Sequence, residues 1–283
     1  MICDTVDLYT YFSRLREGAA AGKLKRFLHG QITESEGLQK IRPAMLVIPG
    51  GGYGMVSQRE NEAVALAYFA AGYNAFVLEY DVAPLHYPVQ LLEAGMAMLY
   101  LRREAAALDI DGAHIAAVGF SAGGHLCGCI SLLWDDPALR AAFGAECEQI
   151  RPDASVYSYP VVTCDPAKAH LDSFRNFCGG AAPFEAYSLE KHVRPNASPS
   201  FLWATSEDNA VPVENAVLLY SALHAAGVPA ELHLFERGQH GLSVCNEEVY
   251  PCPTGGGYYA QAANWLPLSL GFLRGHGFAL RNK

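Results

Sequence analysis

Short continuous apolar runs alternate with longer stretches of helical spacing through most of the chain. Continuous apolar runs predict strands that are buried on both faces, because such strands have no solvated side on which polar residues could alternate. Apolar residues three and four positions apart predict helices. The expected strands cover residues 43–48, 74–78, 115–118, 154–159, 199–205 and 231–235, and the expected helices cover residues 59–71, 87–107, 126–133, 213–226 and 261–274. This alternation indicates an α/β protein with a mostly parallel central sheet and helices on both faces.

Two stretches depart from this alternation. Residues 6–11 and 27–32 each predict a short strand, and neither is continuously apolar, so we expect both at the edge of the sheet. Residues from about 160 to 197 are rich in Asp, Pro and Gly and predict no strand. We expect this segment to fold over the carboxyl edge of the sheet. Neither a repeat nor a linker divides the chain, so we expect a single domain over residues 1–283.

Composition and charge limit the kinds of molecule that the protein is expected to bind. Apolar residues make up 51% of the chain and charged residues 17%, which indicates a globular protein with a sizeable core. The formal net charge of -9 argues against a nucleic-acid surface, which requires clustered Lys and Arg, and against anionic membranes. The N-terminus lacks the basic start and apolar core of a signal peptide. No apolar run reaches the ~20 residues that cross a bilayer. We therefore expect a soluble, cytoplasmic protein with no nucleic-acid or membrane partner.

The eight cysteines are scattered along the chain rather than grouped. Cys127 and Cys129 are two positions apart in an expected helix, so their side chains point in different directions and form a poor metal pair. The chain is also too long to need disulfide staples. We expect free thiols in a reducing compartment and no metal site.

A glycine-flanked serine follows the expected strand 115–118. Gly119, Ser121 and Gly123 form a G-x-S-x-G pattern between this strand and the expected helix 126–133, which is the context that the motif requires. There a sharp turn exposes the serine hydroxyl above the sheet, and the flanking residues must be small because backbone passes close to them. The pattern also fits a simple tight turn in which the serine caps the helix. Whether Ser121 is a nucleophile therefore depends on whether the rest of the chain contains a base and an acid that could activate it.

A serine nucleophile needs a base, and the base must itself be oriented. In sheets of this kind, ligand-binding and catalytic residues lie just beyond the carboxyl ends of the strands. Of the histidines that follow residue 205, His240 alone lies in a loop just beyond a strand end, between Gly238 and Gly241. We therefore predict His240 as the base, the alternative being a solvent-exposed loop histidine.

The acid should also follow a strand. Asp208 lies just beyond the strand that ends at residue 205. It is a better candidate than Glu207, because its shorter side chain suits a tight loop in which Pro212 opens the next helix. Asp165 and Asp172, after an earlier strand, are weaker alternatives. Asp208 could instead cap a helix or stabilise a turn.

The chain order Ser121, Asp208, His240 is the nucleophile–acid–histidine order of the α/β-hydrolase scheme. Acyl transfer also needs N–H donors for the oxyanion of the tetrahedral intermediate. The backbone N–H of Ala122 is one candidate, and the glycine loop 50–52 supplies others, because glycines let the backbone turn its N–H groups inward. That loop lacks the sequence of a dinucleotide or phosphate site. A purely structural turn is the alternative.

With these residues assembled, the chain resembles the α/β-hydrolases of the acetyl esterase group and is similar to acetylxylan and feruloyl esterases over roughly residues 43 to 275. The motifs that carry the resemblance are Pro49-Gly50-Gly51-Gly52-Tyr53, Gly119-Phe120-Ser121-Ala122-Gly123-Gly124-His125, Asp208 with Val211-Pro212, and Gln239-His240-Gly241. In this family the pattern implies a catalytic triad of Ser121, Asp208 and His240 and an oxyanion hole of Gly51, Gly52 and Ala122. Pro49 stands where hormone-sensitive-lipase-like sequences have a histidine, which leaves the geometry of the oxyanion loop open.

The resemblance implies a cofactor-free serine carboxylesterase that hydrolyses short-chain acyl esters through an acyl-enzyme on Ser121. Its small-molecule substrates would include O-acetyl groups on sugars or xylan-derived oligosaccharides. A peptidase of the same fold and a catalytically silent binding protein are the alternatives. The segment from Asn246 to Tyr259 could shape the acyl or sugar pocket, and Tyr53, Tyr258 and Tyr259 could stack on a sugar ring or be ordinary loop aromatics. The sequence makes no prediction of oligomeric state.

Overall fold

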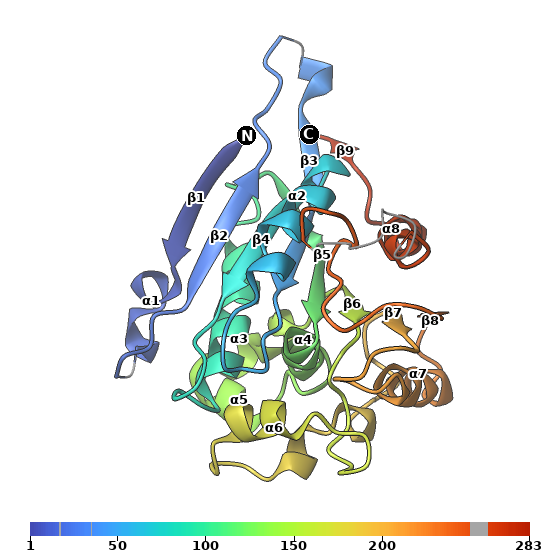
Figure 1. Cartoon of the computed structure of the whole chain (residues 1–283). Coiled ribbons are helices and arrows are strands. Elements are labelled where there is room, and N and C mark those ends of the chain that lie inside the picture. Colours follow the sequence, from blue (N-terminus) through green and yellow to red (C-terminus); the bar gives the residue numbers. More distant parts are fainter. Residues whose placement is uncertain (17, 35, 250–259) are drawn as a thin grey trace.

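The computed structural model describes residues 1–16, 18–34, 36–249 and 260–283. Within these residues the central sheet has the order β1-β2-β4-β3-β5-β6-β7-β8, and β9 pairs with β3 (Figure 1). The strands are β1 (Ile2–Asp7), β2 (Lys23–Leu28), β3 (Lys40–Ile48), β4 (Asn74–Glu79), β5 (Ile110–Phe120), β6 (Ala154–Ser158), β7 (Ser200–Thr205), β8 (Ala230–Phe235) and β9 (Arg281–Asn282).

Along the chain, most of the helices connect one strand to the next. The α-helices are α1 (Leu8–Tyr11), α2 (Glu62–Ala70), α3 (Val89–Arg103), α4 (Ala122–Leu132), α5 (Pro137–Phe143), α6 (Leu171–Cys178), α7 (Glu214–Ala225) and α8 (Trp265–Gly275). The 3-10 helices are η1 (Ser13–Leu15), η2 (Glu36–Leu38), η3 (Gln58–Glu60), η4 (Gly144–Ile150), η5 (Phe184–Tyr187), η6 (Leu189–Lys191) and η7 (Ala262–Asn264). No helix in the described part of the chain combines the length and the apolar character needed to cross a membrane.

The pairing of the strands confirms the expected mostly parallel sheet. β3 pairs in parallel with both β4 and β5, and β6, β7 and β8 continue the parallel order on the side of β5. β1 and β2 are antiparallel to their neighbours, as is β9. The parallel strands therefore all end at one edge of the sheet, which is where ligands bind in folds of this class.

Side chains on the two faces of the sheet belong to two hydrophobic clusters. On β3, Leu46 and Ile48 face one cluster, which includes residues of α1, α3, α4 and α7. Met45 and Val47 point to the other face, where the cluster includes residues of α2 and α8. All four side chains are completely buried. Burial on both faces explains why these strands are continuously apolar in sequence.

The N-terminal predictions need correction. The strand expected over residues 6–11 is wrong beyond Asp7, because the Asp7 carboxylate accepts hydrogen bonds from the backbone N–H groups of Tyr9 (2.8 Å) and Thr10 (3.0 Å) and so starts α1. The strand expected over residues 27–32 begins earlier and ends at Leu28. It also lies between β1 and β4 rather than at the edge.

The segment from 160 to 197 contains no strand among its residues, all of which the structure describes, and it folds over the carboxyl edge of the sheet as expected. Figure 1 shows this yellow-green to yellow segment, with α6, at the end toward which β3 and β5 point. The Asn176 side-chain N–H of α6 donates to the carbonyl oxygen of Gly52, just beyond β3, over 2.9 Å. The segment therefore contacts the glycine loop directly.

Replacement of Leu99 by Ala should destabilise the fold far more than the same change at Leu66. Leu99 is completely buried on α3, whereas Leu66 on α2 is 42% exposed. We expect Leu99→Ala to lower the free energy of unfolding by about 2–5 kcal/mol, because it removes buried methyl groups and leaves a cavity. Leu66→Ala should change it by less than about 0.5 kcal/mol. Equilibrium urea denaturation measures both, and equal losses would contradict the placement of α3 against the sheet.

Candidate active site

Ser121 lies at the sharp turn between β5 and α4. Its backbone has φ 53° and ψ -119°, a region that non-glycine residues rarely adopt. Hydrogen bonds on both sides hold this conformation: the Ser121 N–H donates to the carbonyl of Ser158, and the Val161 N–H donates to the carbonyl of Ser121, each over 3.0 Å. The Ser121 side chain makes no capping bond to α4. The alternative interpretation of this serine as a simple helix cap is therefore wrong.

The small residues around Ser121 are required by close backbone approach. A Cβ atom at Gly119 would overlap the carbonyl of Gly123, and one at Gly123 would overlap the carbonyl of Ile48 at the end of β3. At Gly50 a Cβ atom would lie 2.7 Å from the carbonyl oxygen of Phe120 and 2.9 Å from the Cβ of Ser121. The glycine loop after β3 is thus packed directly against the turn that carries the serine.

The structure brings Ser121, His240 and Asp208 together. The distance from Ser121 Oγ to His240 Nε2 is 2.7 Å, and the distance from His240 Nδ1 to Asp208 Oδ2 is 2.6 Å. Because a carboxylate only accepts hydrogen bonds, Nδ1–H donates to Asp208 and Nε2 is left to accept the Ser121 hydroxyl proton. This is the geometry in which a histidine can take a proton from a serine.

Asp208 is fixed in position by its own loop. Its side chain is 1% exposed, and Oδ1 accepts hydrogen bonds from the backbone N–H groups of Ala210 (3.0 Å) and Val211 (2.9 Å). The alternatives lie elsewhere: Asp165 is exposed and accepts from the N–H of Ala167, and Asp172 is exposed and pairs with an arginine of α6. Among Asp165, Asp172 and Asp208, only Asp208 is hydrogen-bonded to His240.

Three backbone N–H groups are available beside Ser121. Gly51 (φ 118°) and Gly52 (φ 63°) have the left-handed backbone that turns successive N–H groups to one side. The Ala122 N–H is at the first turn of α4, where the helix has unpaired donors and positive partial charge. None of these three groups donates a hydrogen bond within the residues that the structure describes. The arrangement can therefore accommodate a negatively charged oxygen.

Tyr53 does not occupy the position expected for a sugar-stacking residue. Its side chain is 0% exposed, and its ring packs against those of Tyr80, Phe177 and His125. Its hydroxyl donates to His125 Nδ1 over 2.8 Å, while His125 Nε2–H donates to the carbonyl of Tyr187 over 2.8 Å. Burial lowers the pKa of His125 to about 4, so this ring is neutral. Tyr53 therefore anchors the glycine loop, and its ring is closed to a ligand. Tyr258 and Tyr259 lie outside the described residues.

His170, which the sequence pattern did not indicate, also lies beside the glycine loop. A Cβ atom at Gly52 would be 3.8 Å from His170 Cε1. The His170 Nδ1 accepts from the backbone N–H of Ser173 over 3.3 Å and lies 2.8 Å from the hydroxyl of that residue, so the proton of the neutral ring is on Nε2. Burial, and secondly the nearby His240, lower the pKa of His170, which favours the neutral ring. The residue lies in the irregular segment, where no periodic pattern could have identified it.

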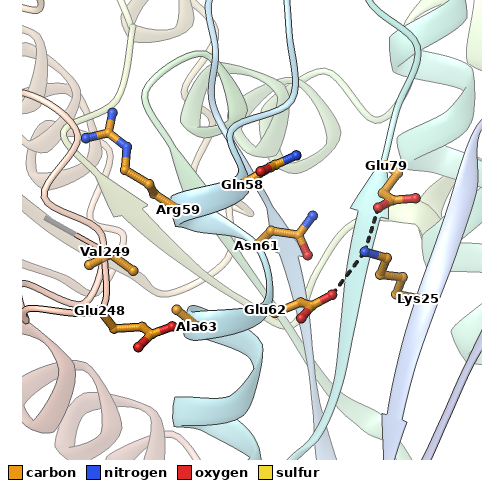
Figure 2. A pocket seen from close by; sticks show the side chains of 9 residues that line it. All are labelled: Lys25, Gln58, Arg59, Asn61, Glu62, Ala63, Glu79, Glu248 and Val249. Carbon is orange, nitrogen blue, oxygen red and sulfur yellow. Dashed lines mark hydrogen bonds and ion pairs between the residues drawn. The ribbon is translucent and has the colours of Figure 1, made fainter.

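A separate polar pocket of about 470 Å³ lies beside η3 and the start of α2 (Figure 2). Ser121, Asp208 and His240 are not among its lining residues. Lys25 lies at one side and forms ion pairs with Glu62 (3.1 Å) and Glu79 (2.9 Å). Arg59 lies at the other side, where a Cβ atom at Gly241 would be 3.0 Å from its guanidinium. The pocket thus borders the loop of His240 but is not lined by the side chains of Ser121, Asp208 or His240.

The chain is similar to known proteins in both sequence and structure. The chain matches the BD-FAE family over residues 31–223. It is 40% identical over 225 residues to endo-1,4-beta-xylanase B of Butyrivibrio fibrisolvens, covering 77% of this chain and 35% of the relative. It is 28% identical over 207 residues to an acetylxylan esterase of Xylanibacter ruminicola, covering 70% of this chain and 41% of the relative. The chain thus spans well under half the length of these two relatives.

Solved structures match almost the whole chain. An acetyl ester-xyloside bifunctional hydrolase from Caldicellulosiruptor lactoaceticus is 31% identical with a TM-score of 0.77, covering 95% of this chain and 97% of that one. An α/β hydrolase enzyme from a Medee basin deep-sea metagenome library is 29% identical with a TM-score of 0.75, covering 98% of each chain. The fold is therefore the α/β-hydrolase fold, and the chain belongs to the BD-FAE family of esterase-like proteins.

Proposed function

We propose that this chain is a serine carboxylesterase that hydrolyses short-chain acyl esters, with O-acetyl groups on sugars or xylan-derived oligosaccharides as its substrates. The observation that carries the proposal is the hydrogen-bonded series from Ser121 Oγ to His240 (2.7 Å) and from His240 to Asp208 (2.6 Å), beside unpaired backbone N–H groups. The relatives named as an acetylxylan esterase and an acetyl ester-xyloside hydrolase support the choice of substrate.

In the acylation step, Ser121 Oγ attacks the carbonyl carbon of the ester while His240 Nε2 takes the hydroxyl proton. Asp208 stabilises the imidazolium that forms, because its carboxylate accepts from Nδ1–H. The carbonyl oxygen becomes an oxyanion, which accepts hydrogen bonds from the N–H groups of Gly51, Gly52 and Ala122. When the tetrahedral intermediate collapses, the imidazolium gives its proton to the alcohol oxygen and the alcohol leaves.

Deacylation repeats these steps with water. His240 takes a proton from a water molecule, whose oxygen attacks the acyl carbon of the acyl-enzyme. The same N–H groups bind the second oxyanion. Collapse then breaks the bond to Ser121 Oγ, which receives the proton held by His240, and the carboxylic acid is released. The cycle needs no group beyond the residues of this chain and water.

Replacement of Ser121 by Ala should abolish esterase activity. The substitution removes the only atom that forms the acyl-enzyme, so kcat on p-nitrophenyl acetate should fall by at least about 10⁴-fold. Ser221→Ala is a matched control, because this serine is exposed on α7 and its hydroxyl donates to the carbonyl of Val217 in the same helix. Activity that survives in Ser121→Ala would overturn the nucleophile assignment. A wild-type chain that hydrolyses neither p-nitrophenyl esters nor acetylated xylo-oligosaccharides would overturn the esterase proposal.

His170 should bind the alcohol part of the substrate through its Nε2–H. We expect His170→Ala to raise KM for acetylated xylo-oligosaccharides by about tenfold, the effect of losing one hydrogen bond to a sugar hydroxyl. The kcat/KM for p-nitrophenyl acetate should change by less than about twofold, because that leaving group has no hydroxyls. Steady-state kinetics on both esters measure this, with His224→Ala, an exposed histidine of α7, as the control. Equal losses on the two substrates would contradict a role for His170 in sugar recognition.

A further inference from the structure

A buried carboxylate that the proposed mechanism does not use holds the glycine loop. Glu60, at the end of η3, is 2% exposed. Its Oε2 accepts from the backbone N–H of Gly50 over 2.8 Å, and its Oε1 accepts from the hydroxyl of Tyr159 over 2.7 Å. Gly50 directly precedes Gly51 and Gly52, the two glycines proposed above as donors to the oxyanion. Glu60 thus fixes the start of that loop from inside the protein.

Tyr159 connects the same carboxylate to the loop of the base. Its hydroxyl oxygen accepts from the backbone N–H of Ser243 over 2.9 Å, and Ser243 lies three residues beyond His240. The rings of Tyr159 and His240 also meet edge to face, with centroids 5.0 Å apart. Tyr159 is 2% exposed and follows β6. One buried hydroxyl therefore contacts Glu60 on one side and the backbone beyond His240 on the other.

Ser243 is bound from several directions. Besides its N–H, its hydroxyl donates to the carbonyl of Arg59 over 2.6 Å, and its own carbonyl accepts from the indole N–H of Trp265 over 2.9 Å. Tyr159 and Ser243 both have positive φ values, 37° and 53°. Such conformations persist only where surrounding contacts enforce them, and they gather at functional sites. The adjacent residues Arg59 and Glu60 supply two of the contacts.

We propose that Glu60 and Tyr159 are positioning residues that couple the glycine loop to the loop of His240. Neither side chain is placed on a reacting atom of the proposed mechanism. Their hydrogen bonds connect Gly50, which precedes the proposed oxyanion donors, to Ser243, which follows the proposed base. The connection keeps the donors and the base at a fixed distance and orientation to each other. Hydrogen bonds to a buried carboxylate are strong, and loss of the acceptor leaves donors unpaired in a dry interior. This inference rests on the esterase function proposed above.

Glu60→Gln should separate a positioning role from simple packing. The amide has nearly the same shape but a single acceptor oxygen, so it can accept from Gly50 or from Tyr159 but not from both. We expect kcat on p-nitrophenyl acetate to fall by about 10- to 100-fold, because small displacements of reacting groups are costly in the transition state. KM should stay within about threefold of the wild-type value. The control is Glu62→Gln, two residues away, where the side chain is 60% exposed.

Tyr159→Phe tests the same connection with a smaller change, because it keeps the ring and removes only the shared hydroxyl. It should lower kcat with KM nearly constant, as Glu60→Gln does. Because the two residues act through one connection, the double variant should have a kcat within about threefold of the slower single variant. Unchanged kcat in both single variants, a rise in KM alone, or fully additive losses would each overturn the proposal.

Amide hydrogen exchange gives a readout that does not depend on catalysis. Both variants should accelerate exchange in the peptide that contains residues 241–245, because the N–H of Ser243 loses its acceptor or the support of that acceptor. Exchange at the wild-type rate in both would overturn the coupling. If the wild-type chain had no esterase activity, the proposed function would fail, while faster exchange in the variants would still support the connection between the loops.

Discussion

The positive φ of Ser121 is the constraint on which the candidate site depends. It places the hydroxyl beyond the end of β5 and starts α4 at the next residue, so the proposed nucleophile and the Ala122 N–H are fixed by the same turn. A turn this tight needs backbone at van der Waals distance on every side. Gly123 meets the end of β3, and Gly50 meets Ser121 itself. The parallel sheet supplies the rigid strand ends that make such close packing possible.

The sequence predicts the centre of the fold well, because burial on both faces leaves a continuous apolar run wherever a strand is central. It also identifies Ser121, Asp208 and His240, since each follows a predicted strand and the strands share one edge. The structure joins these three side chains by hydrogen bonds. His240 lies outside residues 31–223, which the family match covers, so that match does not bear on its position beside Ser121.

Other features depend on contacts that the pattern of apolar residues does not record. The Asp7 side chain converts an apparent strand into α1 through two short-range bonds. Tyr53 looks like an exposed loop aromatic because glycines surround it, yet its ring lies in the core. Glu60 and Tyr159 are 99 residues apart and meet only in the folded chain. A buried acid in a short 3-10 helix carries no sequence signature that would separate it from a solvated one.

The attachment of the glycine loop to the segment from 160 to 197 has a consequence for how activity can vary. Asn176 holds the carbonyl of Gly52, and Tyr187 accepts from the histidine that binds Tyr53. The glycines that we propose as donors to the oxyanion are therefore held in place partly by contacts with the least regular portion of the described chain. In the proposed mechanism, amino-acid changes in that portion can alter the rate of acyl transfer while Ser121, Asp208 and His240 stay the same, so the identity of these three residues alone would be a poor measure of the rate.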